Sequence, residues 1–161
     1  NLTEKTNVLI DEACTEVRRI SHNMMPQALS ISGLKGAIED LGDQLQEQGY
    51  ITTVELTNLP EKIDPTREVM IYRLLQEILS NIRKHSNAKT ILLQLLGHQN
   101  EINIIVEDDG EGFDYSEEIK KGGLGLKSIN SRVQYLDGTI NWDTKPDKGT
   151  TINITIPADV S

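Results

Sequence analysis

The sequence is poor in cysteine, in aromatic residues and in long apolar runs. Its single cysteine, Cys14, excludes a disulfide framework and argues against a cysteine-based zinc site. Aromatic residues make up only 4% of the chain, so we expect an aliphatic core. The sequence contains no run of about 20 apolar residues that could span a membrane and no signal peptide. We therefore expect a cytoplasmic protein.

Positive charge is also scarce, because 16 Lys and Arg face 25 Asp and Glu, which gives a formal net charge of −9. Nucleic-acid binding depends on clustered cations that displace counter-ions from phosphates. No such cluster stands out, so we expect no nucleic-acid partner. The first residue is Asn1 rather than Met, and we therefore expect a fragment of a longer protein.

Hydrophobic periodicity predicts an alternation of helices and strands. We expect helices at about 3–24, 32–48, 66–85 and 124–136, and strands at 50–56, 90–96, 102–106, 139–144 and 150–156. Residues 111–121 are polar and lack strong periodicity, which predicts a mobile loop. This order predicts a two-layer α/β (α+β) sandwich: a mixed sheet of about five strands, with three helices on one face, preceded by an N-terminal helix.

The helix predicted over 66–85 carries four functional candidates: Glu77, Asn81, Lys84 and His85. Residues one turn apart share a stripe on a helix. The Asn81 carbonyl oxygen suits Mg²⁺, and a carboxylate one turn away can orient or deprotonate a nucleophile. Lys84 and His85 could meet phosphate oxygens. The alternative is a solvated polar face whose cationic end complements the helix dipole.

Two glycine-rich segments follow along the chain. Asp108-Asp109-Gly110-Glu111-Gly112 ends an apolar strand, where a carboxylate can accept a hydrogen bond from an exocyclic amine and glycines let the backbone turn sharply. Gly122-Gly123-Leu124-Gly125-Leu126 leads into a helix whose N–H groups could cradle an anion. An ordinary acidic turn or a calcium loop would also fit the first segment. The second matches neither a P-loop nor a dinucleotide-binding fingerprint.

The order of these motifs is more informative than any one of them. An Asn-bearing helix is followed by Asp108-x-Gly110-x-Gly112, a loop, Gly123-x-Gly125-Leu126 and a late Gly149-Thr150. The series resembles the N, G1, G2 and G3 boxes of the ATP-binding fold shared by histidine kinases, gyrase-type topoisomerases, Hsp90 chaperones and MutL-type repair proteins. The resemblance covers about residues 31–157 and implies a Bergerat-type fold that binds ATP and Mg²⁺.

Within this superfamily, the sequence is similar to sensor histidine kinases of the nitrate-sensor and desaturase-thermosensor type. Gln76-Glu77-Ile78-Leu79-Ser80-Asn81, with Lys84-His85-Ser86 and Ala88, resembles their N box. Gly125-Leu126, with Ser128-Ile129 and Arg132, resembles the helix that ends their ATP lid. The short segment between Gly112 and Gly122 is typical of the same subfamily.

The resemblance also implies a role for each matching residue. Asn81 would ligate Mg²⁺, Glu77 would act on or orient the attacking imidazole, and Lys84 and His85 would contact phosphates. Asp108 would bind the adenine amino group, Gly110 and Gly112 would shape that wall, Gly123, Gly125 and Leu126 would anchor the lid, and Thr150 would line the adenine end. The implied activity is transfer of the γ-phosphoryl of ATP to a histidine.

Three histidines, His22, His85 and His98, are candidates for the acceptor. His85 lies in the N box and His98 in a predicted turn. His22 is followed by Asn23 instead of an acidic residue, and residues 16–26 resemble the end of a second dimerization helix. We therefore expect the acceptor to lie upstream of Asn1.

The resemblance divides the chain into residues 1–30, the end of a dimerization helix with its linker, and residues 31–161, the ATP-binding catalytic domain. It implies three partners: the protein's own dimerization and acceptor-histidine domain, a response regulator, and a second copy of the parent, with a possible membrane tether upstream. The alternatives are an anti-sigma-factor-type serine kinase and a module of the same fold that senses nucleotide without turnover.

Overall fold

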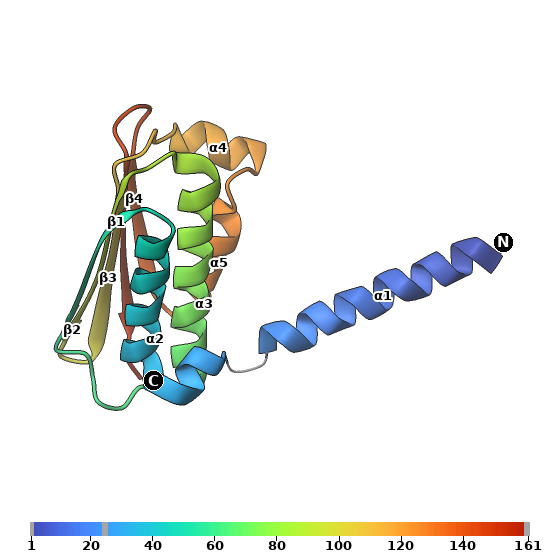
Figure 1. Cartoon of the computed structure of the whole chain (residues 1–161), viewed down its shortest axis with the longest axis horizontal. Coiled ribbons are helices and arrows are strands. Elements are labelled where there is room, and N and C mark those ends of the chain that lie inside the picture. Colours follow the sequence, from blue (N-terminus) through green and yellow to red (C-terminus); the bar gives the residue numbers. More distant parts are fainter. Residues whose placement is uncertain (1, 24–25, 160–161) are drawn as a thin grey trace.

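The computed structural model describes residues 2–23 and 26–159, with the backbone alone over 14–23. The first helix, α1 (Leu2–Asn23), extends away from the rest of the chain (Figure 1). Its apolar side chains Leu2, Val8, Leu9 and Ile10 are all exposed. The side chains of Cys14 and His22 lie outside the described part of the chain, so our expectations for these two residues stay predictions.

The sheet has five strands in the order β1-β2-β3-β5-β4. Their bounds are Ile51–Thr57 for β1, Thr90–His98 for β2, Glu101–Asp108 for β3, Thr139–Thr144 for β4 and Thr150–Pro157 for β5. β1 pairs with β2 in parallel, and the other neighbours are antiparallel. The sheet is therefore mixed, as the sequence predicted.

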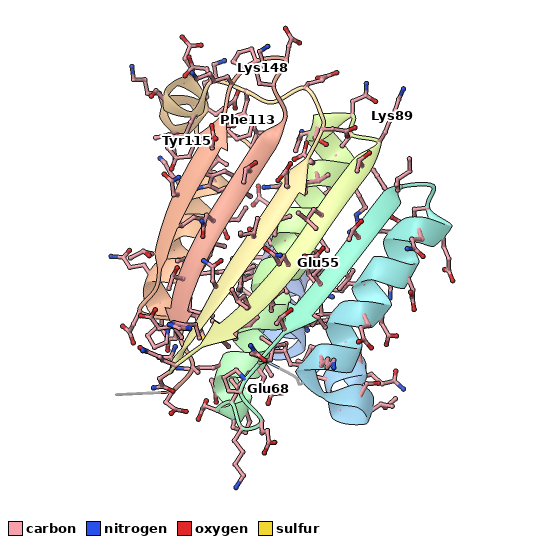
Figure 2. The ribbon with its side chains drawn as sticks, turned by 90° about the vertical axis from the view of Figure 1, so that its left-hand side faces the viewer. Glu55, Glu68, Lys89, Phe113, Tyr115 and Lys148 are labelled. Atoms are coloured by element: carbon pink, nitrogen blue, oxygen red, sulfur yellow. The ribbon has the colours of Figure 1, made fainter. Side chains whose placement is uncertain are left out.

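Within the described residues, three helices cover one face of the sheet: α2 (Gln27–Glu47), α3 (Pro65–Asn81) and α5 (Leu126–Tyr135) (Figure 1). The other face carries no helix and is seen in Figure 2, where Glu55 of β1 lies on it. Alternate strand residues point to opposite faces, so β2 and β3 bury every second side chain under the helices. The core is almost wholly aliphatic, and the predicted two-layer fold is confirmed.

Two helices differ from the sequence prediction. The helix expected over 32–48 begins already at Gln27 and is interrupted at Gly33, whose φ of +68° suits glycine. The segment 111–121, predicted as a loop, contains the helix α4 (Tyr115–Lys121). The segment shows no apolar periodicity that would predict a helix, because none of its residues is fully buried. Local capping defines this helix instead, since the Asp114 side chain accepts from the Glu117 amide at 3.1 Å.

Helix α3 is the element that carries the predicted polar stripe. Pro65 occupies its first turn, and the Asp64 side chain accepts from the Arg67 amide at 3.1 Å. At its other end the chain continues as a π-helix, η1 (Ile82–Ser86). No described helix is both long and apolar enough to cross a bilayer.

Arg67 joins three parts of the fold at the end of the sheet away from η1. The side chain is only 5% exposed. Its Nη1 donates to the carbonyls of Leu136 at 2.8 Å and Pro157 at 3.2 Å, and Nη2 pairs with Asp137 at 3.2 Å. The guanidinium therefore ties the start of α3 to the residues that follow α5 and to the end of β5.

We expect Arg67→Met to lower the free energy of unfolding by about 2–4 kcal/mol, because two carbonyls lose their buried donor. Asp137→Asn is the matched control and should cost less than about 1 kcal/mol, since Asp137 is exposed. Urea unfolding followed by circular dichroism measures both. Equal losses for the two variants would show that the surface ion pair, and not the carbonyl contacts, carries the stabilisation.

Candidate functional site

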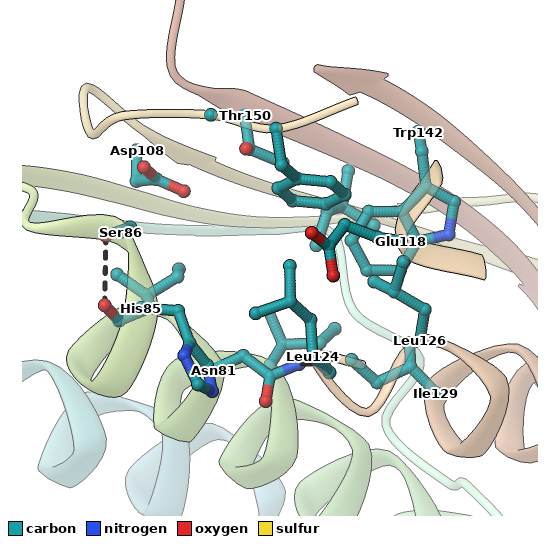
Figure 3. A pocket seen from close by; sticks show the side chains of 15 residues that line it. Asn81, His85, Ser86, Asp108, Glu118, Leu124, Leu126, Ile129, Trp142 and Thr150 are labelled. Carbon is teal, nitrogen blue, oxygen red and sulfur yellow. Dashed lines mark hydrogen bonds between the residues drawn. The ribbon is translucent and has the colours of Figure 1, made fainter. Parts of the chain in front are cut away.

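A cavity of about 210 Å³ opens between α3, η1, the end of β3, the start of β5 and the segment that leads from α4 to α5. Six of the predicted site residues line it: Asn81, His85, Asp108, Gly112, Leu126 and Thr150. Figure 3 shows Asp108 and Trp142 at opposite ends of this cavity, with Asn81 on the helix side between them. The structure thus brings together residues from all four sequence motifs.

The remaining predicted residues lie around the cavity without forming its lining. Glu77 is one turn before Asn81 and pairs with Arg132 of α5. Lys84 is exposed, whereas its neighbour His85 lies at the cavity mouth. Both residues belong to η1, whose π-helical geometry differs from the α-helical angle that the spacing argument assumed. Such single π turns often occur at functional sites.

Asp108 is the buried acid of the site, with only 6% of its surface exposed. Its Oδ1 accepts from the Gly110 amide at 2.8 Å. Burial raises the pKa of the Asp108 carboxyl above its ordinary value, and the hydrogen bond from Gly110 offsets part of that rise. A buried carboxylate that keeps acceptor capacity toward a cavity is suited to bind a donor on a ligand.

The adjacent Asp109 has a different role. Its Oδ1 accepts from the amides of Lys89 and Thr90, each at 2.8 Å. These hydrogen bonds lower the pKa of the exposed Asp109 carboxyl. Asp109 therefore secures the start of β2, and of the two neighbouring acids only Asp108 faces the cavity.

The glycines of the first turn are required by close backbone packing. A Cβ at Gly110 would lie 2.3 Å from the Ser86 carbonyl oxygen, and one at Gly112, where φ is +60°, would lie 2.1 Å from that of Lys145. The Glu111 amide donates to the same Ser86 oxygen at 2.7 Å. Each contact leaves no room for a side chain, so the turn can rest directly on its neighbours.

The turn between β4 and β5 completes this end of the cavity. The hydroxyls of Thr144 and Thr150 lie 2.8 Å apart, and the Phe113 amide donates to Thr144 at 3.2 Å. A Cβ at Gly149 would lie 2.3 Å from the Asp108 carbonyl oxygen. Thr150 is thereby held beside Asp108, its cross-strand partner.

Asn81 faces the segment that joins α4 to α5, where its Nδ2 donates to the Leu124 carbonyl. This contact leaves Oδ1 as the carboxamide atom that can coordinate a cation. Among the described residues, no three His, Cys, Asp or Glu side chains cluster in a way that could hold a metal ion. The donor set nevertheless fits Mg²⁺, which is commonly bound by one or two protein oxygens together with substrate phosphates and water. Asn81 would be the protein ligand.

Helix α4 and the residues after it form a lid over the cavity. The helix ends at Gly122, whose φ is +70°, and the chain then turns back through Leu124 and Gly125. The carboxylate of Glu118 lines the cavity and points into it (Figure 3). Glu118 therefore adds negative charge to the wall that faces Asn81.

Three of the chain's few aromatic residues meet beside the lid. The Trp142 ring lies 6.2 Å from that of Phe113 and 5.7 Å from that of Tyr115, measured between ring centroids. Trp142 Nε1 donates to Asn130 Oδ1 at 2.9 Å, and Asn130 Nδ2 donates to the Tyr115 hydroxyl at 2.8 Å. This cluster links the start of α4 to α5 and β4.

Sequence reasoning missed most of the apolar wall of the cavity and two polar residues on it. The additional lining residues are Ile78, Ile82, Ser86, Phe113, Glu118, Leu124, Ile129, Trp142 and Ile152. The alternation along the last two strands could have indicated Trp142 and Ile152, which are cross-strand partners on one face. Glu118 gave no such signal because its helix was not predicted.

Comparison with known proteins agrees with this geometry. Residues 66–160 match the family described as histidine kinase-, DNA gyrase B-, and HSP90-like ATPase. The chain is 31% identical over 150 residues to the signal transduction histidine-protein kinase/phosphatase DegS of Brevibacillus brevis, covering 92% of this chain and 39% of DegS. It is 33% identical over 152 residues to the sensor histidine kinase ComP of Bacillus subtilis, covering 93% of this chain and 20% of ComP.

The fold is also found among solved structures. The histidine kinase domain of the blue-light activated histidine kinase from Erythrobacter litoralis EL346 superimposes with a TM-score of 0.67 at 20% identity, over 82% of this chain and 69% of that one. An identity this low shows the fold alone. The chain spans less than half the length of the two curated relatives. It belongs to the histidine kinase-, DNA gyrase B-, and HSP90-like ATPase family, and within that family it is similar to the two histidine kinases named above.

Proposed function

We propose that this domain binds Mg²⁺–ATP in the cavity and donates the γ-phosphoryl group to a histidine outside these 161 residues. The observation that carries the proposal is the buried Asp108 carboxylate at one end of a cavity whose helix side presents Asn81. The two residues suit opposite ends of a nucleotide, since one accepts hydrogen bonds and the other offers a neutral, hard oxygen.

The adenine would lie between Gly112 and the apolar residues of α3, with its amino group donating to Asp108. The Gly110 amide already occupies Oδ1, so Oδ2 is the oxygen with capacity for the amino group. Thr150, held against Thr144, would border the same end. The flat backbone at Gly112 and the side chains of Ile78 and Ile82 offer the apolar surface that a ring needs.

The phosphates would extend toward Asn81, His85 and the lid. A bound Mg²⁺ would neutralise charge on the transferring phosphoryl group. The Asn81 Oδ1 would hold that ion, while the Asn81 Nδ2 keeps its contact with Leu124. Glu118 lies on the wall that faces Asn81, and its carboxylate would repel a triphosphate, so α4 would have to swing outward when nucleotide enters.

Glu77 would orient the acceptor imidazole. The ring nitrogen without a proton forms the bond to the γ-phosphorus, while the bond from that phosphorus to the β–γ bridging oxygen breaks and its electron pair leaves with ADP. The proton on the other ring nitrogen is accepted by the Glu77 carboxylate. Most of the rate enhancement would come from positioning and electrostatics.

The acceptor and the partners complete the proposal. His85 belongs to the cavity mouth, and His98 lies at the end of β2, so neither suits an acceptor. We propose that residues 1–30 are the end of a dimerization helix, for which the exposed Val8, Leu9 and Ile10 of α1 supply apolar surface. A second copy of the parent protein and a response regulator would be the partners. The cytoplasmic location stays a prediction.

The nucleotide assignment predicts specific losses of affinity. In Asp108→Asn the amide nitrogen replaces Oδ2 and meets the adenine amino group donor to donor, so we expect ATP to bind about 10- to 150-fold more weakly, the loss of one charged hydrogen bond. Asn81→Ala should remove the Mg²⁺ dependence of binding. Fluorescence of Trp142, the only tryptophan, reports the titration from inside the cavity.

Matched controls are Asp43→Asn and Asn141→Ala, both at exposed positions away from the cavity. They should bind like the wild type. Unchanged affinity and metal dependence in both cavity variants would show that the nucleotide lies elsewhere.

Asp108 also predicts two opposite pH dependences. Because its folded-state pKa is raised, the folded protein binds more protons than the unfolded chain between the ordinary and the raised value. The free energy of unfolding should therefore fall as pH rises through this window. ATP affinity should rise over the same window, because the adenine amino group needs the carboxylate. Asp108→Asn should lose the slope in ATP affinity, measured by titration. It should lose only part of the slope in unfolding, measured with urea, because burial also raises the pKa of Glu68. A variant that keeps both slopes unchanged would assign them to another group.

The position of the acceptor can be tested with ATP labelled on the γ-phosphate. The 161-residue chain should bind the nucleotide but acquire no acid-labile, base-stable label on His22, His85 or His98. A longer polypeptide that includes the preceding segment should become labelled on a histidine there. Stable labelling of His22 in the present chain would instead place the acceptor on α1.

A further inference from the structure

Arg132 connects the lid-end helix to the predicted catalytic residue of α3. Its Nε donates to Oε2 of Glu77 at 2.5 Å, across 55 positions of sequence. The two side chains are 29% and 24% exposed, so the pair is largely withdrawn from water. A partly exposed ion pair of this kind adds little to the free energy of unfolding. Its main effect is to fix the orientation of both side chains.

The pair lies at the base of the lid. A Cβ built on Gly125 would be 3.6 Å from Glu77 Oε1 and 3.5 Å from the Asn81 carboxamide. The Leu124 carbonyl accepts from Asn81 Nδ2. Segment 124–132 thus contacts both Glu77 and Asn81 of α3. It forms a hydrogen bond with one atom of each side chain, Oε2 of Glu77 and Nδ2 of Asn81.

We infer that Arg132 is a positioning residue for phosphoryl transfer. It holds Oε2 of Glu77, so that Oε1 is kept in place to accept the proton of the acceptor imidazole. The inference rests on the proposed function and adds a residue through which the lid-end helix acts on the reacting groups. The sequence motif around Gly125 gave no reason to connect Arg132 with Glu77.

The alternative role for an arginine at this place is direct binding of the triphosphate. Binding and rate measurements distinguish the two roles. An arginine that contacts phosphate affects the dissociation constant of ATP, whereas one that orients Glu77 affects the rate of transfer from bound ATP. Misplacing a reacting group by about 1 Å can cost on the order of 100-fold in rate.

The experiment measures both quantities. ATP affinity is obtained by titration of the present chain, and the single-turnover transfer rate by labelling the longer polypeptide at saturating ATP. Arg132→Gln should slow transfer about 10- to 100-fold and leave the dissociation constant of ATP unchanged. Arg132→Lys should restore part of the rate, because the lysine ammonium can also donate to Glu77. Glu77→Gln combined with Arg132→Gln should be no slower than Glu77→Gln alone.

Arg83→Gln is the matched control, since Arg83 is exposed and lies with Leu41 and Gln44 on the α2 side of α3. It should keep both the rate and the affinity. A weakened ATP affinity with an unchanged rate in Arg132→Gln would assign Arg132 to the phosphates and overturn the inference alone. Equal rates for the wild type and Arg132→Gln would do the same. A wild-type protein that binds no ATP or transfers no label would overturn the proposed function and the inference together.

Discussion

The site depends on how helix α3 is packed against the sheet. Ile71, Leu75 and Ile78 are fully buried along one side of this helix, while Glu77 and Asn81 lie along a neighbouring side. Turning or sliding the helix would pull these isoleucine and leucine side chains out of a close-packed core, at a cost of about 2–5 kcal/mol for each site emptied. The core therefore sets the position of the polar residues, and the same contacts that stabilise the fold keep Asn81 at a constant distance from Asp108.

The end of the cavity at Asp108 depends on a second constraint, the close approach of backbone segments. Carbonyl oxygens of Ser86, Lys145 and Asp108 occupy the space where side chains at Gly110, Gly112 and Gly149 would lie. Because these glycines carry no Cβ, the first turn, the end of η1 and the β4–β5 turn can pack as one layer behind Asp108. The glycines of the motif therefore build the wall of the cavity against which the Asp108 carboxylate is buried.

The sequence predicted the parts of the fold that bury a periodic apolar face. Strands β2 and β3 alternate, α3 repeats its aliphatic stripe, and the order of motifs predicted which ends would meet. It failed for α4, because Tyr115–Lys121 has a local cap and none of its side chains is fully buried. It did not predict the π-helix η1, because a spacing argument assumes one constant helical angle. The Glu77–Arg132 pair was beyond reach for another reason, since no local pattern shows which of 16 cations meets which of 25 acids.

Three polar residues in and beside the cavity share one arrangement. Asp108 uses Oδ1 for the Gly110 amide, Asn81 uses Nδ2 for the Leu124 carbonyl, and Glu77 uses Oε2 for Arg132. In each case the protein holds one atom of a two-atom group, which removes the rotation that a ligand would otherwise have to arrest. The orientation of the second atom, Oδ2 of Asp108, Oδ1 of Asn81 or Oε1 of Glu77, is therefore fixed before any ligand binds. Segment 124–132 makes two of these three contacts, so the residues that directly follow the movable helix α4 also determine the orientation of Asn81 and Glu77.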